Sequence, residues 1–332
     1  MILHPGILAL LAGSGIVLAM MLAATGVGFA VMRRWDFGSS SEEQLLLERK
    51  TYLIASIVKY ALGFELLAGL LFIYTVDDIH NAFVGAMCAT GSLNANPVGW
   101  AALMTKIAVF FGAALWIALN AIDQRAEDFP LVKPKYTALM VVTLLVAADL
   151  VLTARYFLGL EPEVITSCCG SLFSSADTGV AGDLAALPAK SMMWAFYGSA
   201  GLFLCTALAG LFYRNASVSY AVSLFAALFF PVSLAAVVSF ISLYIYELPS
   251  HHCPFDIFQK NYNFVGYPLY LGLFGGVLFG LLPGLSQPLK KRASLAPVIE
   301  RLERKWLILS ILLILSFLAL ATWPVVFGNL TL

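Results

Sequence analysis

Residues 307–318 read LILSILLILSFL, a run of apolar side chains that contains no charged residue. The run lies inside a longer apolar segment, 306–328. A helix needs about 20 mainly apolar residues to cross a hydrocarbon core of roughly 30 Å. A transmembrane β-strand would instead alternate apolar and polar residues. The segment therefore predicts a membrane-spanning helix.

Seven further segments have the same length and apolar character. They are 6–32, 52–75, 98–122, 136–158, 191–213, 217–246 and 266–287. The whole chain of 332 residues is 61% hydrophobic and 11% charged, whereas soluble domains carry roughly a quarter charged residues. We expect an all-α, polytopic transmembrane helix bundle of eight spans, forming one integral membrane domain over residues 1–332.

The distribution of basic residues predicts how these spans are oriented. Most Lys and Arg residues fall in the connections 33–51, 123–135, 214–216 and 288–305. Connections rich in Lys and Arg stay in the cytoplasm by the positive-inside rule. Both termini are therefore expected to be extracytoplasmic, in a multi-pass protein of the bacterial inner (plasma) membrane.

Several classes of function are disfavoured by the same composition. Nineteen Lys and Arg residues balance 19 Asp and Glu residues, which leaves no basic surplus to neutralise nucleic-acid phosphates. The chain contains no GxGxxG, no GxxxxGK[ST] and no CxxCH motif, so neither nucleotide chemistry nor covalent haem is indicated. The expected surroundings are a lipid bilayer, without nucleic acid as a partner.

Thiols and imidazoles gather in the segments predicted to be extracytoplasmic. These residues are Cys88, Cys168, Cys169, Cys253, His4, His80, His251 and His252. All but His4 lie in three long loops, 76–97, 159–190 and 247–265, which we expect to form a Cys/His-bearing cap. The fifth cysteine, Cys205, lies within a span and is expected to be a small buried hydrophobe.

One interpretation of the outer thiols is structural. Four cysteines in an oxidising compartment commonly form two disulfides. Adjacent cysteines resist pairing with each other because the bridge strains the peptide between them. Cys168 and Cys169 would therefore reach Cys88 and Cys253, in either order. A protein stapled in this way fits a membrane anchor subunit of a respiratory complex.

A second interpretation, which we favour at this point, is thiol-disulfide electron transfer. Cys253 would be the exchanging thiol, with His252 lowering its pKa and Cys88 or the Cys168–Cys169 pair as resolving thiols. Electrons would pass to or from a periplasmic thiol protein, with a quinone as the membrane carrier. In its four outward cysteines the chain is similar to the quinone-linked disulfide-forming membrane proteins, but it lacks their Cys-x-x-Cys motif and is not assigned to them.

A third interpretation is a soft-metal site. Thiolate and imidazole together suit Cu(I) or Zn(II). His251, His252 and Cys253 are consecutive, and His80 lies on another of the outer loops. These four residues are the candidate ligands of a Cu or Zn transporter or insertion factor.

Three ionisable residues lie inside predicted spans, where each is a functional hypothesis by default. Glu65, Lys106 and Asp149 are all expected about 12–15 Å below the outer interface, at a rise of about 1.5 Å per residue. Glu65 and Lys106 lie on consecutive spans and are expected to pair. The pair either fixes helix register or relays protons. If Glu65, Lys106 and Asp149 were all ionised, one negative charge would be in excess, which favours protonation of one of the two acids.

Two local patterns predict a surface helix and a close helix contact. Residues 41–50 read SEEQLLLERK, which predicts a short amphipathic surface helix capped by Ser39, Ser40 or Ser41. Glycines at 272, 276 and 280 have the four-residue spacing that lets another helix approach closely.

Overall fold

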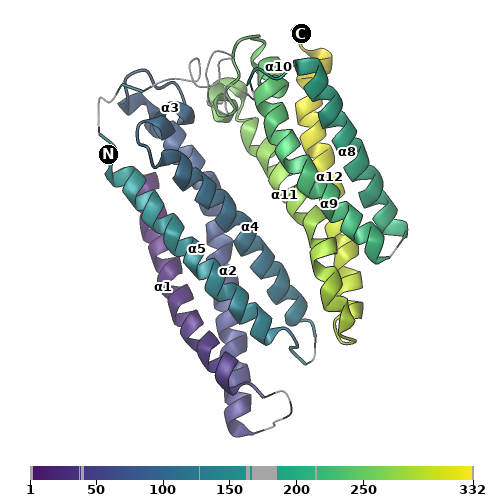
Figure 1. Ribbon diagram of the computed structural model, residues 1–332. Helices are drawn as coiled ribbons and strands as arrows, with labels where there is room; N and C mark the ends of the chain where they lie inside the picture. The colour runs from purple at the N-terminus through teal and green to yellow at the C-terminus, as the bar shows by residue number, and fades with distance from the viewer. Residues whose placement is uncertain are drawn as a thin grey trace. The chain divides into compact units, whose positions relative to one another are not determined.

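The computed structural model describes residues 3–36, 38, 41–126, 128–161, 165–166, 185–213 and 215–330. Within these residues the secondary structure is helical, apart from an isolated bridge between Val84 and Ile165. Eight helices are long and apolar enough to cross a membrane, as predicted for an integral membrane protein (Figure 1). They are α1 (Pro5–Arg34), α2 (Glu42–Asp78), α4 (Gly99–Asp123), α5 (Val132–Leu158), α8 (Ala189–Phe212), α9 (Ala216–Ala236), α11 (Gly266–Ser286) and α12 (Ala296–Phe327).

Short helical elements extend or connect these spans. A π-helical turn, η2 (Val237–Ile241), and α10 (Ser242–Tyr246) continue α9, and η5 (Gln287–Lys291) continues α11. The remaining short elements are η1 (Ile79–Ala82), α3 (Ala89–Asn94), η3 (Asp256–Phe258) and η4 (Lys260–Tyr262). All four of these lie in segments that sequence analysis placed in the extracytoplasmic cap.

The chain forms two compact units. Unit 1 comprises Met1–Thr75, Asn96–Pro162 and Arg292–Val298, and unit 2 comprises Val76–Ala95, Glu163–Lys291 and Ile299–Leu332. Helices α2 and α12 each contribute to both units.

Unit 1 is built on α5, against which α1 and α4 both pack. The apolar core of this unit includes Met21, Val109 and Leu139, with the indole of Trp116 among them. The Trp116 indole N–H donates to the backbone oxygen of Lys135 at 3.0 Å, so this large ring leaves no buried donor unsatisfied.

Unit 2 is built on α9, which packs against α8 and α11. A cluster of phenylalanine rings fills its centre: Phe196 lies 5.9 Å from Phe229 and 5.8 Å from Phe317, measured between ring centroids. Aromatic pairs at these separations add stabilisation beyond the area that they bury.

The glycines of α11 permit close helix packing, as expected. A Cβ atom at Gly276 would lie 2.6 Å from the side chain of Ile314, and one at Gly272 would lie 3.0 Å from the backbone oxygen of Leu313. The Ser310 hydroxyl of α12 donates to the Gly276 oxygen at 2.6 Å. Helices α11 and α12 therefore approach each other at a distance that larger residues would prevent.

Two local expectations were wrong. Residues 42–50 are the first turns of α2 and not a separate surface helix, since neither Gly nor Pro separates them from the span. The capping prediction holds in part, because the Ser41 hydroxyl accepts a hydrogen bond from the Gln44 amide at 3.3 Å.

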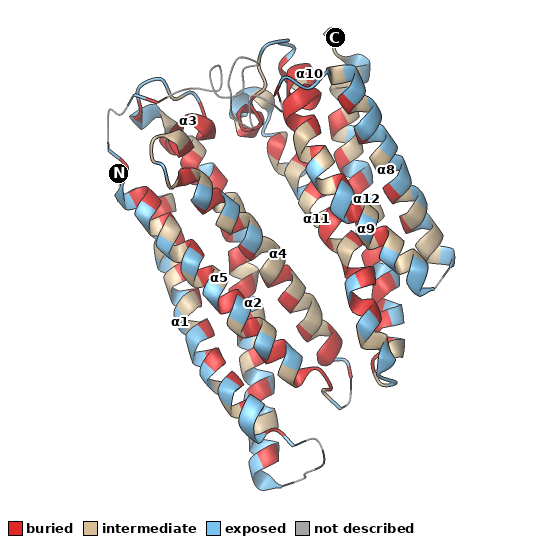
Figure 2. Ribbon diagram, in the orientation of Figure 1, coloured by how far each residue is buried: buried red, intermediate tan, exposed pale blue. Residues whose placement is uncertain are grey.

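Cys205 is exposed and not buried. The buried face of α8 runs through Phe196, Ala200, Phe203 and Ala207, and Cys205 lies away from that helical stripe. Large apolar side chains are also exposed along other spans, as in Leu144 (72% exposed) and Leu312 (59%). Exposed positions are distributed along the helices in Figure 2, as expected for helices with a lipid-facing side.

Candidate functional site

Three side chains with metal-ligating atoms meet in unit 2: Cys88, Cys253 and Asp256. One ligand atom from each lies within 4.8 Å of the others. Cys88 precedes α3, Cys253 follows α10, and Asp256 begins η3. Both cysteines have no exposed surface and Asp256 is 8% exposed. We call these three residues the thiol–carboxylate cluster.

Two of the three separations within the cluster have the size expected around a four-coordinate metal ion. The Sγ atoms of Cys88 and Cys253 are 3.6 Å apart. The Sγ atom of Cys253 lies 3.4 Å from Oδ1 of Asp256. Bonds of about 2.3 Å to sulfur and about 2.0–2.2 Å to carboxylate oxygen, at tetrahedral angles, give edges of about 3.8 Å and about 3.6 Å. The observed separations agree with these values to within a few tenths of an ångström.

The segment that carries Cys88 is held by polar contacts on both sides of the thiol. The Ala89 amide donates to Oδ1 of Asp77 at 3.1 Å. The Gln259 side-chain amide donates to the Met87 oxygen at 2.7 Å and to Oδ1 of Asp77 at 3.3 Å. Gln259 thereby ties the Cys88 segment to the segment that carries the other two cluster residues.

A tight turn precedes Cys88. The Thr166 amide donates to the Val84 oxygen at 2.9 Å, beside the bridge between Val84 and Ile165. Gly85 then has a φ of +86°, and a Cβ atom there would lie 2.8 Å from the Thr166 oxygen. Only glycine meets both conditions without strain, so the sequence VGAMC is suited to turning the thiol inward.

Tyr246 positions the loop that carries Cys253. Its hydroxyl donates to the Cys253 oxygen at 2.6 Å and accepts from the Ile257 amide at 3.0 Å. The Phe255 amide donates to Sγ of Cys253 at 3.4 Å, and the Thr90 hydroxyl lies 3.6 Å from the same sulfur. The Phe255 amide and the Thr90 hydroxyl therefore hold this sulfur in place from two sides.

The Asp256 carboxylate is oriented by His251, whose Nε2 atom forms a hydrogen bond with Oδ2. Burial by itself raises the pKa of the Asp256 carboxyl. Hydrogen bonds from His251 and from both cluster thiols, together with the charge of His251, outweigh burial and lower this pKa below its ordinary value. Asp256 is therefore an anionic acceptor at neutral pH.

The other imidazoles expected at the site have different partners. Nδ1 of His80 contacts the Asp77 oxygen, and Nδ1 of His252 lies 2.9 Å from the Val238 oxygen. Of the four metal ligands expected from the sequence, only Cys253 belongs to the cluster found among the described residues. His251 acts on that cluster through Asp256.

Asp256 was not among the site residues predicted from the sequence. Its signal is the spacing Cys253-Pro-Phe-Asp256, which places a carboxylate three residues after a cysteine. Cys168 and Cys169, expected as partners of the outer cysteines, lie outside the described residues. Cys88 and Cys253 lie beside each other without a disulfide bond.

The ionisable residues within the spans of unit 1 pair differently from the expectation. The Lys106 ammonium lies 2.6 Å from Oδ2 of Asp149, and both side chains are almost fully buried. The Thr105 hydroxyl donates to Oδ1 of Asp149 at 3.4 Å. Lys106 therefore pairs with Asp149 and not with Glu65.

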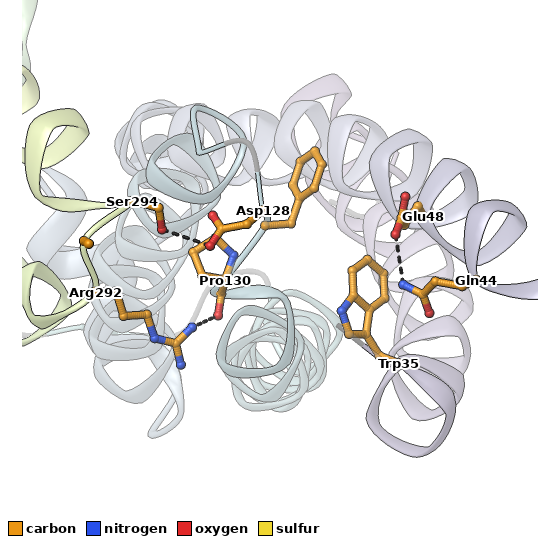
Figure 3. Close-up of a pocket in the computed structure, with 9 residues that line it drawn as sticks. Trp35, Gln44, Glu48, Asp128, Pro130, Arg292 and Ser294 are labelled. Carbon is orange, nitrogen blue, oxygen red and sulfur yellow. Dashed lines mark hydrogen bonds between the residues drawn. The ribbon is translucent and has the colours of Figure 1, made fainter. Parts of the chain in front are cut away.

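Unit 1 also contains a cavity of about 830 Å³ near the ends of α1, α4 and α5 (Figure 3). The Arg292 guanidinium donates to the Pro130 oxygen, and the Ser294 hydroxyl donates to Oδ2 of Asp128 at 3.0 Å. The described residues that line this cavity include no thiol and no imidazole. Its polar groups bond to one another across the lining, so it is a weaker functional candidate than the thiol–carboxylate cluster.

The cluster offers two sulfur donors and one oxygen donor at metal-binding separations. The same two sulfurs are also close enough for the two thiols to be oxidised reversibly to a disulfide. No protein-family model, curated protein or solved structure matches this chain.

Proposed function

We propose that this integral membrane protein binds a soft or borderline metal ion, Zn(II) foremost, at Cys88, Cys253 and Asp256, and that it serves in transport or insertion of that ion. The observation that carries the proposal is the convergence of three buried ligand atoms within 4.8 Å of one another. The Lys and Arg distribution supports an extracytoplasmic position for the site.

The donor set favours Zn(II) over Cu(I). Soft thiolates suit both ions, whereas a carboxylate is a harder ligand that zinc commonly accepts. Hydrogen bonding from His251 fixes the orientation of the Asp256 carboxylate, as outer groups do around bound metals. Three protein ligands leave a fourth position for water or for an exchanging ligand, which transfer of the ion requires.

The test is metal analysis of the full-length protein purified in detergent, followed by zinc titration against a competing chelator. We expect one high-affinity Zn(II) per chain, lost in Cys88→Ser, Cys253→Ser and Asp256→Asn. Cys205→Ser is the matched control, because it removes an exposed thiol outside the cluster. Retention of zinc by all three cluster variants would refute the proposal. If Asp256→Asn left zinc binding intact while both cysteine variants lost it, Asp256 would be excluded as a ligand and the three-ligand site would be refuted.

A second candidate, thiol-disulfide electron transfer, is favoured by the 3.6 Å separation of the two sulfurs. A disulfide bond of about 2.05 Å would form after a modest approach. Its formation releases two protons and two electrons from Cys88 and Cys253. The two electrons and two protons pass together to a quinone, which becomes a quinol, or to the disulfide of a periplasmic protein, which becomes two thiols. Because both sulfurs are fully buried, attack by a partner's thiolate requires the cap to open.

Thiol counting separates the two candidates. Alkylation under denaturing conditions, before and after mild reduction, reports whether Cys88 and Cys253 are bridged in the purified protein. A labile bridge in metal-free protein supports electron transfer. Two unbridged thiols accompanied by stoichiometric zinc support metal binding.

A further inference from the structure

Unit 1 contains a carboxylate that has no hydrogen-bond partner among the described residues. Glu65 lies in the interior of α2 and is 2% exposed. Neither of its carboxylate oxygens is satisfied. The Ser14 hydroxyl of α1, also 2% exposed, is a weak hydrogen-bonding neighbour of Glu65, although neither side chain makes a hydrogen bond of normal geometry. Buried polar groups in native proteins are rarely left in this state, so Glu65 needs a ligand or a proton.

The charged groups that act on Glu65 come from two neighbouring helices. They are Lys106 of α4 and Asp149 of α5. Helix α1 carries no ionisable side chain between Pro5 and Met32. Since Lys106 and Asp149 already neutralise each other at 2.6 Å, an ionised Glu65 would leave one net negative charge among these three side chains.

A proton fits this position better than a metal cation does. Hard cations take about six oxygen ligands, whereas the groups shown to act on Glu65 within the described part of the chain supply one hydroxyl, that of Ser14, besides the ion pair. Binding a proton removes the charge and gives the carboxyl group a donor. An isolated carboxylate in an apolar environment neutralises in this way.

We infer that Glu65 is a proton-binding site in the membrane-spanning part of unit 1, and that Glu65 and Asp149 compete for Lys106. With Glu65 protonated, Lys106 stays on Asp149, as the structure shows. When Glu65 releases its proton, the new carboxylate attracts the Lys106 ammonium away from Asp149. Each cycle moves one proton on or off Glu65 without redox chemistry. The inference is independent of the proposed metal site.

Infrared spectroscopy of the full chain in lipid nanodiscs tests both parts, because the carbonyl stretch of a protonated carboxylic acid is resolved from the bands of a carboxylate. At neutral pH we expect a protonated-carboxyl band that disappears in Glu65→Gln and persists in the exposed control Glu43→Gln. Asp149→Asn should also abolish the band, since it frees Lys106 to neutralise an ionised Glu65. A band unchanged by Glu65→Gln would overturn the proton site. A band unchanged by Asp149→Asn would overturn the competition for Lys106.

A second measurement uses the unmodified protein and does not depend on a variant that folds. Hydrophobic carbodiimides react with protonated carboxyl groups inside a membrane. Peptide mass analysis should find the adduct on Glu65 at neutral pH, with less adduct at alkaline pH, and should find Asp149 unmodified. Labelling of Asp149 in preference to Glu65 would overturn the assignment.

Discussion

The buried ion pair between Asp123 and Lys135 gives a sharp test of how the α4–α5 connection is stabilised. Nζ of Lys135 lies 2.5 Å from Oδ2 of Asp123, and the two side chains are 2% and 0% exposed. The Leu131 amide also donates to Oδ1 of Asp123 at 2.8 Å. Asp123 therefore joins the end of α4 to the start of α5 through two contacts, one charged and one from the backbone.

Replacing Lys135 by Met keeps the bulk of the side chain but leaves the carboxylate buried without its cation. Removing one partner of a buried pair costs about 3–5 kcal/mol. The Leu131 amide remains as a donor to the carboxylate, so we expect the lower end, about 3 kcal/mol. In the double variant Asp123→Asn, Lys135→Met the charge is gone and the Leu131 contact is kept. That variant should regain all but about 1 kcal/mol, the net value of one ordinary hydrogen bond.

The assay is equilibrium unfolding in mixed micelles, followed by far-ultraviolet circular dichroism. Wild type, Lys135→Met and the double variant are compared under identical detergent conditions. Equal free energies of unfolding for Lys135→Met and wild type would refute the reasoning. A double variant no more stable than Lys135→Met would show that the uncompensated charge is not the cause.

Three further predictions follow from the site and the packing. His251→Ala should weaken zinc binding by about 10–100-fold, the usual effect of losing a group that orients a ligand, as measured by chelator competition. Gly276→Ala should destabilise unit 2, because its Cβ would lie 2.6 Å from a side chain of α12, as measured by a lower melting temperature in detergent. In intact cells an impermeant maleimide should label Lys260→Cys, whereas Lys291→Cys should need permeabilised membranes, as the charge distribution predicts.

Each of these experiments has its own control or contrary result. His252→Ala should leave zinc affinity unchanged, since the recorded contact of that ring is with the Val238 oxygen; equal losses in both histidine variants would argue against the role of His251. Gly201→Ala meets no atom within 4 Å and should not lower the melting temperature. Labelling of both lysine-to-cysteine variants from the same side would contradict the predicted orientation.

The membrane spans could be predicted because length and apolarity are properties of each segment taken alone. Their ends were harder to predict. Helix α2 starts at Glu42 because no helix breaker separates residues 42–50 from the span. The amphipathic pattern of those residues predicts a helix but does not indicate whether that helix ends before the span begins. The exposure of Cys205 could have been anticipated from the helical repeat of Phe196, Ala200 and Phe203 on α8.

The site was predictable in its location more than in its composition. The predicted orientation of the spans was enough to place the segments of Cys88 and Cys253 on the same side of the membrane, although these residues are 165 positions apart. Which side chains meet depends on turns such as the one at Gly85. The spacing of residues along the sequence does not reveal how the loops turn. The pairing of Lys106 with Asp149 and not Glu65 was likewise set by packing, since the sequence offers Lys106 two acids at similar depth.

The long separation of the two sulfurs along the chain has a consequence for biosynthesis. A nascent polypeptide that has not yet reached Cys253 carries only one of the cluster's three ligands, and Asp256 is translated three residues later. A ribosome-bound intermediate holding the first five spans would therefore lack the complete donor set. The three residues can therefore come together only late in insertion, after the sixth span has entered the bilayer.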